Sequence, residues 1–350
     1  MKIRDVWGVI PTGTNEPRDW RTSMAQYVAV VETDDGVLGT GVGGGGPVAL
    51  HIIDSVLRDV LVGRDPRDFE ANWDAMYRAT HHFGRKGLAV MALSGIDLAL
   101  WDVLGKAENK PVYELLGGLK HDRVPAYASL GATVGDEVER GFRHIKLHMP
   151  NVKEHPNEIV QLVRAGREKI GPDVPLYLDP AARWTWSDCE YLFEALAPFD
   201  IGWIEEPLLA DELDGHRSLR ERFTIPVSGG EHEFTIWGYR EILAKQAMDV
   251  WQPDASWVGG MTTMRQIFEL GQANGIWVVP HRGSEVWGLH AIFGLSDRPL
   301  AETGRPWVTW VQGTPTVEDG WVAPPTGPGF GVTFDDALLA RPSRGKPSRA

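Results

Sequence analysis

Residues 201–254 read IGWIEEPLLADELDGHRSLRERFTIPVSGGEHEFTIWGYREILAKQAMDVWQPD. Three short apolar runs alternate here with longer, more polar stretches of helical composition. This alternation is typical of βα units, whose successive strands join one parallel sheet. The three runs end, in order, at Glu205, Glu231 and Asp254. The segment therefore predicts three consecutive strands with a carboxylate at the end of each.

The same alternation continues on both sides, from about residue 122 to residue 302. Further apolar runs are VPAYA (124–128), FRHIKLH (142–148), VPLYLD (174–179), GIWVVPH (275–281) and LAE (300–302). With the three runs above they give eight expected strands, the number found in a β/α barrel. Apolar residues recur at helical spacing between several of them, as in 159–170 and 264–271. We therefore expect an α/β fold based on a barrel.

The first third of the chain has a different pattern. YVAVVET (27–33) is typical of a strand, and Asp34-Asp35-Gly36 has the composition of a hairpin turn into a second strand. From residue 87 to Leu104, apolar side chains recur at helical spacing. Gly117-Gly118 marks a junction. This region predicts a separate α+β domain.

Composition limits the class of protein. The 350 residues include 48 acidic and 35 basic side chains, for a formal charge of −13, which argues against nucleic acid as a partner. The chain opens without the apolar core of a signal peptide, and no later run approaches the ~18 to 20 apolar residues that span a bilayer. A single cysteine, Cys189, cannot form an internal disulfide. We expect a cytoplasmic protein that does not bind membranes.

Residues capable of chemistry stand at the ends of most expected strands. They are Lys146, His148, Asp179, Glu205, Glu231, Asp254, His281 and Glu302. From Asp179 to His281 the successive steps are 26, 26, 23 and 27 residues, each about the length of one βα unit. Strand ends surround one mouth of a barrel, and this is where catalytic residues of such barrels gather. We therefore expect all these side chains to meet at one site.

Asp179, Glu205 and Glu231 are three carboxylates on adjacent expected strands. A hard cation such as Mg2+ prefers oxygen ligands and keeps positions for water or substrate. One such carboxylate could simply cap the next helix, but three in register favour a metal site. Glu206 and Glu233 are given no metal role, because adjacent side chains of a strand point in opposite directions.

His281 and Asp254 end neighbouring expected strands and predict an acid-base pair. A carboxylate bonded to one imidazole nitrogen fixes the tautomer and raises the basicity of the other nitrogen. Lys146 and His148 lie two apart on one face of their strand and could point into the same mouth, although a solvated lysine is the plainer alternative. Glu302 is either an ordinary rim carboxylate or a partner of a substrate carboxylate.

Several longer motifs follow one another in a fixed order. They are SGIDLALWDVLGK (94–106), KPVYELLGG (110–118), WIEEP (203–207), SGGEHE (228–233), QPDASWVGGMT (252–262), VVPH (278–281) and GPGFGV (327–332). WIEEP alone is a weak signal, whereas the ordered set is specific. Over nearly its whole length the chain resembles the mandelate racemase branch of the enolase superfamily, and within it the rhamnonate dehydratase-like proteins.

The resemblance implies a modified (β/α)7β barrel with an N-terminal α+β capping domain. The expected boundaries are 1–120 for the capping domain, 121–318 for the barrel, and 319–350 for a C-terminal segment that returns to the capping domain. It also implies Mg2+ on the three carboxylates, the His281–Asp254 pair as acid and base, and Glu302 beside the substrate carboxylate. Relatives imply a homo-oligomer, with an octamer among the expected states.

The second expected strand departs from the branch. Where many members carry Lys-x-Lys, this chain has Lys146-Leu147-His148. A lysine base is therefore doubtful on that face, although His148 could act as an acid or hydrogen-bond donor. Racemisation needs competent bases on both faces, so dehydration by one principal pair is the favoured reaction.

Two further expectations concern substrate contacts. His232 follows Glu231 as in the rhamnonate dehydratase-like proteins, and we expect it to touch the substrate. The first 25 residues look shorter than in those proteins. Their capping loop, PTGTNEPRDWR (11–21), offers Arg18 and Arg21 as contacts for an anion, although solvated loop arginines are an equal alternative.

The function expected from the sequence is that of a Mg2+-dependent acid-sugar dehydratase, which removes the α-proton of a sugar carboxylate and eliminates the β-hydroxyl to give a 2-keto-3-deoxy acid. A racemase or epimerase would use the same site. A cycloisomerase is a further alternative if tryptophans such as Trp184, Trp186, Trp257 and Trp287 line the pocket. A noncatalytic Mg2+-dependent binding protein is the alternative outside enzymes. The sugar acid stays open among L-rhamnonate, L-mannonate, L-lyxonate and others.

Overall fold

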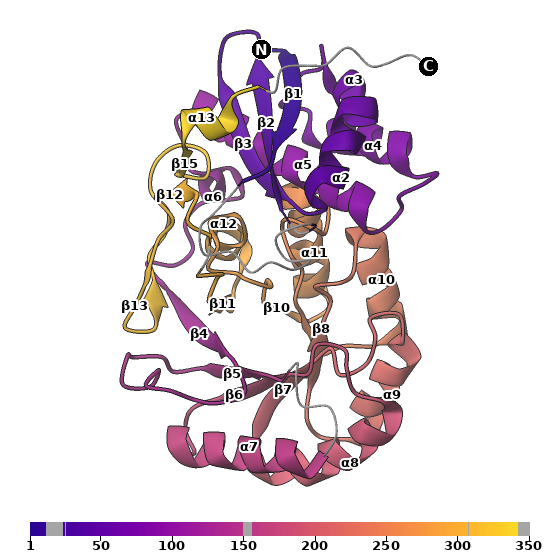
Figure 1. Ribbon diagram of the computed structural model, residues 1–350, viewed down its shortest axis with the longest axis vertical. Helices are drawn as coiled ribbons and strands as arrows, with labels where there is room; N and C mark the ends of the chain where they lie inside the picture. The colour runs from indigo at the N-terminus through magenta and orange to yellow at the C-terminus, as the bar shows by residue number, and fades with distance from the viewer. Residues whose placement is uncertain (12–23, 25, 150–155, 307, 342–350) are drawn as a thin grey trace. The chain divides into compact units, whose positions relative to one another are not determined.

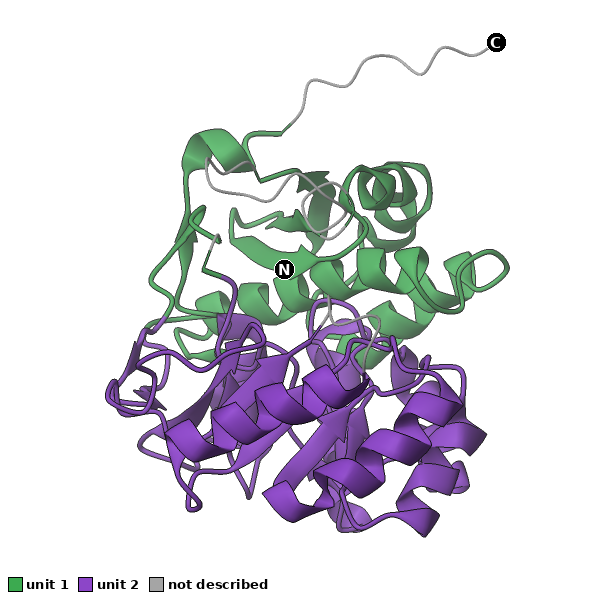
Figure 2. Cartoon of the chain, turned by 60° about the horizontal axis from the view of Figure 1, so that its bottom comes forward, with its two compact units in different colours: residues 1–112, 306–314, 327–350 green, residues 113–305, 315–326 purple. Residues whose placement is uncertain are grey.

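The computed structural model describes residues 1–11, 24, 26–149, 156–306 and 308–341. The chain divides into two compact units (Figure 2). Unit 1 consists of residues 1–112, 306–314 and 327–350, and unit 2 consists of residues 113–305 and 315–326. The chain therefore leaves unit 1, builds unit 2, and comes back to unit 1 twice.

Unit 1 has the α+β composition expected from the sequence. Its sheet is antiparallel in the order β1 (Ile3–Val9), β2 (Tyr27–Thr33) and β3 (Leu38–Gly43), and the predicted turn at 34–36 joins β2 to β3. The helices that follow are α2 (Gly46–Ile52), the π-helical turn η1 (Ile53–Leu57), α3 (Arg58–Leu61), α4 (Phe69–Thr80) and α5 (Leu88–Ala107), with α6 (Val112–Leu115) at the junction.

Helix α5 packs directly on the backbone of β3. A Cβ added to Gly39 would lie 2.2 Å from the carbonyl oxygen of Ala99, and one added to Gly41 would lie 2.2 Å from that of Gly95. The strand therefore carries glycine where it meets the helix, because no side chain fits there.

By length and composition, α5 is also the one helix among the described residues that could cross a membrane. The sequence was expected to hold no run of this length, and α5 departs from that expectation. In the structure 83% of its most apolar window is buried inside the protein, so α5 is a core helix of unit 1.

The motif GPGFGV (327–332) returns the chain to α5. The backbone N–H of Phe330 donates to Asp102 Oδ1 at 2.9 Å, and Gly329 forms a bridge with Pro111. Gly329 has φ +66°, and a Cβ there would collide with the same Asp102 carboxylate. The other elements of these returning segments are β12 (Val311–Gln312), which pairs with β15 (Thr333–Phe334), and α13 (Asp336–Leu339).

Unit 2 is the expected barrel of eight parallel strands. Neighbours follow chain order from β4 to β10, and β11 pairs in parallel with β4, so the first and last strands lie side by side. The strands are β4 (Val124–Leu130), β5 (Ile145–His148), β6 (Leu176–Asp179), β7 (Ile201–Glu205), β8 (Val227–Gly229), β9 (Val250–Trp251), β10 (Trp277–Val278) and β11 (Ala301–Glu302). The α/β barrel with a separate N-terminal α+β domain is thus confirmed.

Helices alternate with these strands, and Figure 1 shows α7, α8 and α9 on the outer side of β5, β6 and β7. They are α7 (Pro156–Ile170), α8 (Trp186–Leu196) with the 3-10 turn η2 (Ala197–Phe199), α9 (Leu213–Arg222), α10 (Thr235–Lys245), α11 (Gly260–Ala273) and α12 (Val286–Leu295). The first connection is different, because residues 131–144 form no helix between β4 and β5. A hairpin of β13 (Val317–Glu318) and β14 (Trp321–Val322) pairs with β4 instead.

The barrel interior is filled by large side chains from different strands. Tyr177 on β6 and Trp203 on β7 stack with ring centroids 3.5 Å apart, and Tyr127 on β4 meets both rings edge-on. All three are buried. A packed interior of this kind fixes the strand ends, and with them the side chains that follow.

Candidate active site

The eight residues predicted from strand ends come together at the carboxyl end of the barrel. His148, Asp179, Glu205 and Glu302 are the last residues of their strands. Glu231 lies two residues beyond β8, and Asp254 and His281 each lie three residues beyond theirs. Because the strands are parallel, their carboxyl ends share one edge. The contacts described below join all of these side chains, together with Lys146, into one cluster.

Lys146 holds the centre of the cluster. Its Nζ lies 2.8 Å from Glu205 Oε2, 2.7 Å from Glu302 Oε1 and 3.4 Å from Asp179 Oδ2, and the residue is 1% exposed. Burial disfavours the charged ammonium, but Glu205 and Glu302 outweigh it and hold the pKa of Lys146 well above its usual range. Lys146 is therefore a fixed buried cation, and the alternative of a solvated lysine is excluded.

Of the three proposed metal ligands, Asp179 and Glu205 are buried, and Glu231 is partly buried with its side chain 18% exposed. Burial, only partly offset by Lys146, raises the pKa of Asp179 to about 6 and that of Glu205 to about 7. Burial also raises the pKa of Glu231. Glu205 Oε1 is buried and accepts no hydrogen bond from any described residue. An oxygen donor set with a bare buried oxygen fits a hard divalent cation such as Mg2+.

His281 is held between two carboxylates. Its Nδ1 lies 2.9 Å from Asp254 Oδ2, and its Nε2 lies 3.0 Å from Glu231 Oε2. Burial opposes protonation, but the charge of Glu231 and the bond to Asp254 outweigh it and raise the pKa of His281. The geometry thus brings together the predicted imidazole–carboxylate pair and aims its second nitrogen at a proposed metal ligand.

His148 and Glu302 occupy other positions of the cluster. His148 Nε2 lies 3.5 Å from Asp179 Oδ2, and its side chain is 38% exposed. Burial and the charge of Lys146 lower the pKa of His148 to about 4, so the ring is neutral near pH 7. Glu302 is buried, binds Lys146 through Oε1 and accepts the backbone N–H of Arg282 at Oε2, 2.7 Å away. It is therefore no ordinary rim carboxylate.

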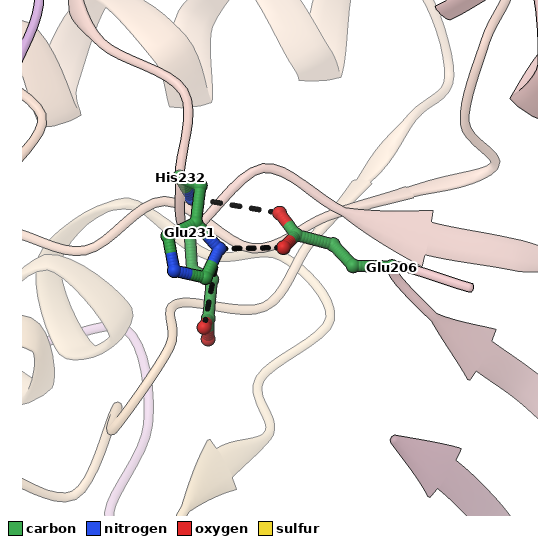
Figure 3. A group of neighbouring side chains, drawn as sticks. All are labelled: Glu206, Glu231 and His232. Carbon is green, nitrogen blue, oxygen red and sulfur yellow. Dashed lines mark hydrogen bonds and ion pairs between the residues drawn. The ribbon is translucent and has the colours of Figure 1, made fainter. Parts of the chain in front are cut away.

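His232 is fixed by a carboxylate from the neighbouring strand end. Figure 3 shows its Nδ1 directed at Glu206, with a distance of 2.6 Å to Oε2, while Glu231 Oε1 lies 3.5 Å away. Glu206 is buried and lies just beyond β7, which ends at Glu205. Its backbone has φ +36°, which is outside the extended conformation of a strand. Strict alternation along the strand therefore does not hold at Glu206, and its carboxylate reaches the site.

Glu206, Glu231 and His232 have potential ligand atoms within 4.8 Å of one another. Burial opposes protonation of His232, but its hydrogen bond to Glu206 outweighs this and raises its pKa to about 10. In this arrangement Glu206 is occupied by His232, whereas Glu205 keeps a bare buried oxygen, and we keep the proposed metal at Asp179, Glu205 and Glu231.

Two residues of the site were not singled out from the sequence. The Arg282 side chain pairs with Asp254 Oδ2, and Gln252 Nε2 donates to Glu205 Oε2 at 2.7 Å. Their sequence signal was proximity to predicted residues, since Arg282 follows His281 and Gln252 precedes Asp254 by two positions. Of the tryptophans named from the sequence, Trp257 lies beside the site, with its ring centroid 5.9 Å from those of both His232 and His281.

The two predicted loop contacts, Arg18 and Arg21, lie outside the described residues, as does most of their loop. They stay predictions from the sequence.

Comparison with known proteins gives consistent matches. Residues 19–117 match the family described as "Mandelate racemase / muconate lactonizing enzyme, N-terminal domain", and residues 130–338 match "Enolase C-terminal domain-like". The L-rhamnonate dehydratase of Saccharopolyspora erythraea is 36% identical over 342 residues, which cover 91% of this chain and 86% of that protein.

Two solved structures extend the comparison. Rhamnonate dehydratase from Gibberella zeae, complexed with Mg, has a TM-score of 0.87 at 27% identity, over 97% of this chain and 95% of its own. The 3,6-anhydro-D-galactonate cycloisomerase from Zobellia galactanivorans has a TM-score of 0.85 at 30% identity, over 97% of this chain and 99% of its own.

Proposed function

The chain belongs to the mandelate racemase/muconate lactonizing enzyme family of the enolase superfamily, and we propose that its strand-end site dehydrates an acid sugar. It is a Mg2+-dependent acid-sugar dehydratase and hence a hydro-lyase, in line with its relatives named rhamnonate dehydratase. The observation that carries the proposal is His281, whose Nδ1 is held by Asp254 and whose Nε2 faces the carboxylate cluster at Glu231.

The cofactor position follows from the buried carboxylates. Asp179, Glu205 and Glu231 would hold Mg2+, and the bare Oε1 of Glu205 supports this choice. When bound, the ion supplies Lewis-acid stabilisation of the negative charge that develops on the substrate carboxylate as the α-proton leaves. Lys146 adds a second, permanent positive charge between Glu205 and Glu302.

The proton chemistry is assigned to His281. Its Nε2 takes the α-proton while Asp254 holds the ring at Nδ1. The β C–O bond then breaks, the proton returns to the departing hydroxyl to give water, and the enol tautomerises to a 2-keto-3-deoxy acid. His148, beside Asp179, is neutral near pH 7 and is the alternative hydrogen-bond donor to the hydroxyl on the opposite face. We assign a substrate oxygen to His232, whose ring orientation is fixed by Glu206.

The finer assignments are proposals of the same kind. We take L-rhamnonate, L-mannonate and L-lyxonate as the first candidate substrates, because a curated relative acts on rhamnonate by name. Arg18 and Arg21 would contact the substrate anion. We further propose that the protein works in the cytoplasm as a homo-oligomer, with an octamer as one state to test, and that its net charge of −13 keeps nucleic acid away.

Cycloisomerisation is the second candidate. One similar solved structure is a cycloisomerase, and Trp257 lies near the rings of both His232 and His281. An aromatic wall at that position would suit a cyclic, less polar acid. Racemisation has less support, because no second lysine follows Lys146 at residue 148.

A substrate panel tests these assignments directly. C5 and C6 aldonic and aldaric acids are incubated with the protein and Mg2+, and 2-keto acid is measured with semicarbazide. Dehydration of at least one acid, absent from the His281→Asn variant, is the expected result. Deuterium exchange at C2 in D2O without dehydrated product would indicate a racemase or epimerase instead. Tight binding without exchange or turnover would indicate a binding protein.

A further inference from the structure

The carboxylate of Asp254 is shared by two cationic or potentially cationic side chains. Its Oδ2 accepts from His281 Nδ1 at 2.9 Å and also from the guanidinium of Arg282, while its Oδ1 accepts the backbone N–H of Ser256 at 2.7 Å. Asp254 is buried. The orientation of this carboxylate is therefore set by three donors, of which His281 is only one.

Arg282 contacts two parts of the site, one through its backbone N–H and one through its side chain. Arg282 has φ +52°, a left-handed conformation that is unfavourable for a side chain of its size. In this conformation its N–H reaches Glu302 Oε2 at 2.7 Å while its side chain reaches Asp254. The guanidinium carbon also lies 5.1 Å from the centroid of the Trp257 ring. Arg282 thus contacts both the acid-base pair and the partner of Lys146.

A second arginine with a largely enclosed side chain, Arg305, lies 23 residues after Arg282 and serves as its control. Arg305 binds Glu285 through two side-chain bonds of 2.7 and 2.6 Å. The side chains of Arg282 and Arg305 are 10% and 9% exposed, respectively. Loss of either guanidinium therefore removes the arginine partner of a largely enclosed carboxylate, but only Arg282 is bonded to Asp254.

We propose that Arg282 is a positioning residue for the His281–Asp254 pair. Its guanidinium fixes the Asp254 carboxylate so that Oδ2 faces Nδ1 of His281, and this in turn holds Nε2 toward Glu231 and the substrate α-carbon. The inference rests on the proposed function, in which His281 transfers the proton. It assigns Arg282 no direct contact with the substrate.

Kinetics of three variants separate positioning from general stability. In Arg282→Met, kcat should fall on the order of 100-fold, the scale of a misplaced catalytic group, with KM and the Mg2+ Kd nearly unchanged. Arg282→Lys should recover part of the rate, because it restores a cation beside Asp254. The control Arg305→Met should lower Tm and leave kcat close to wild type. If Arg282→Met does not fold, Arg282→Lys still tests the proposal through a lowered kcat at constant KM.

A measurement without substrate makes the test independent of the reaction. The Nδ1–H of His281 should give a downfield proton resonance in protein labelled with 15N-histidine, identified by its loss in His281→Asn. This resonance should shift in Arg282→Met and stay in place in Arg305→Met. An unchanged resonance with an unchanged kcat would overturn the proposal, as would equal losses of kcat, Mg2+ binding and Tm in both methionine variants. If the wild type dehydrates no acid, the proposed function fails while the resonance still tests the positioning.

Discussion

Glu205 is the residue on which the metal assignment depends most. One of its oxygens is shared by Lys146 and Gln252, and the other is buried without a partner among the described residues. Glu205→Gln should weaken Mg2+ binding strongly and abolish turnover, because it removes one anionic ligand from a site of fixed geometry. Titration calorimetry measures the affinity. Glu206→Gln is the matched control, and loss of Mg2+ there with full affinity in Glu205→Gln would move the ion to the Glu206 group.

His281 and Asp254 should act as one unit. His281→Asn keeps the size of the side chain but removes proton transfer, so dehydration should fall by at least the ~10²- to 10⁴-fold attributed to general acid-base catalysis. The double variant with Asp254→Asn should be little slower than His281→Asn alone. Steady-state kinetics with a 2-keto acid assay measures both, and Mg2+ binding should survive. C2 deuterium exchange at the wild-type rate in His281→Asn would mean that another residue is the base.

At the level of single residues, the sequence predicted those site residues that follow the regular spacing of the βα units. Spacing of one βα unit was enough to expect Asp179, Glu205 and Glu231 at a common edge, and the structure places them there. It expected Glu206 to point away from the ligands and did not single out Arg282. Both have left-handed backbone beyond a strand end, where alternation no longer tells where a side chain points. The sequence also left open whether Lys146 points into the barrel mouth or into solvent, since its ion-pair partners are three carboxylates from other strands.

At the scale of elements, the contact between β3 and α5 should tolerate no side chain. Gly41→Ala should destabilise the protein by roughly 1–3 kcal/mol or more, because the added methyl group would overlap the backbone of α5. Chemical denaturation followed by circular dichroism measures the change. Gly131→Ala is the control, since nothing lies within 4 Å of a Cβ there. Equal stability of both variants would contradict the packing described for unit 1.

The sequence predicted those elements in which apolar residues form a continuous run or recur at regular spacing. All eight barrel strands were expected from apolar runs, and β2 has the residue limits given by its β-branched sequence. The region before residue 87 was read only in part, and β1 and the helices α2 to α4 were not assigned. The alternation predicted helical stretches between the expected strands, yet residues 131–144 form no helix, and the unexpected β14 pairs with β4.

For the whole molecule, the buried His216 and the partly buried His144 predict a fold that is sensitive to acid. Burial lowers the pKa of His144 and of His216 from 6.5, and His216 Nε2 has no partner among the described residues. Such a histidine binds protons more tightly when unfolded, so its contribution to stability is present above pH 6.5 and is lost as the pH falls below it. Asp179 and Glu205 have raised pKa values and act in the opposite direction.

The contribution of His216 to acid sensitivity is measured by comparing the pH dependence of stability in the wild type and in a variant without this histidine. The free energy of unfolding of wild type and His216→Gln is compared between about pH 7.5 and about pH 5. The wild type should lose more stability than the variant on acidification. Parallel curves would show that His216 binds protons equally in the folded and the unfolded chain, contrary to the prediction.

The discontinuous make-up of unit 1 has a consequence for synthesis on the ribosome. Residues 1–112 leave the ribosome first, but Phe330, which donates to the buried Asp102 of α5, belongs to a segment made only after unit 2. At about 5–20 residues per second, α5 spends on the order of 10 to 40 s without this partner. All residues of unit 2 are thus synthesised before residues 327–350 of unit 1. The completion of unit 1 therefore depends on one of the last segments to be made, and a nascent chain that ends before Phe330 still lacks this partner of Asp102.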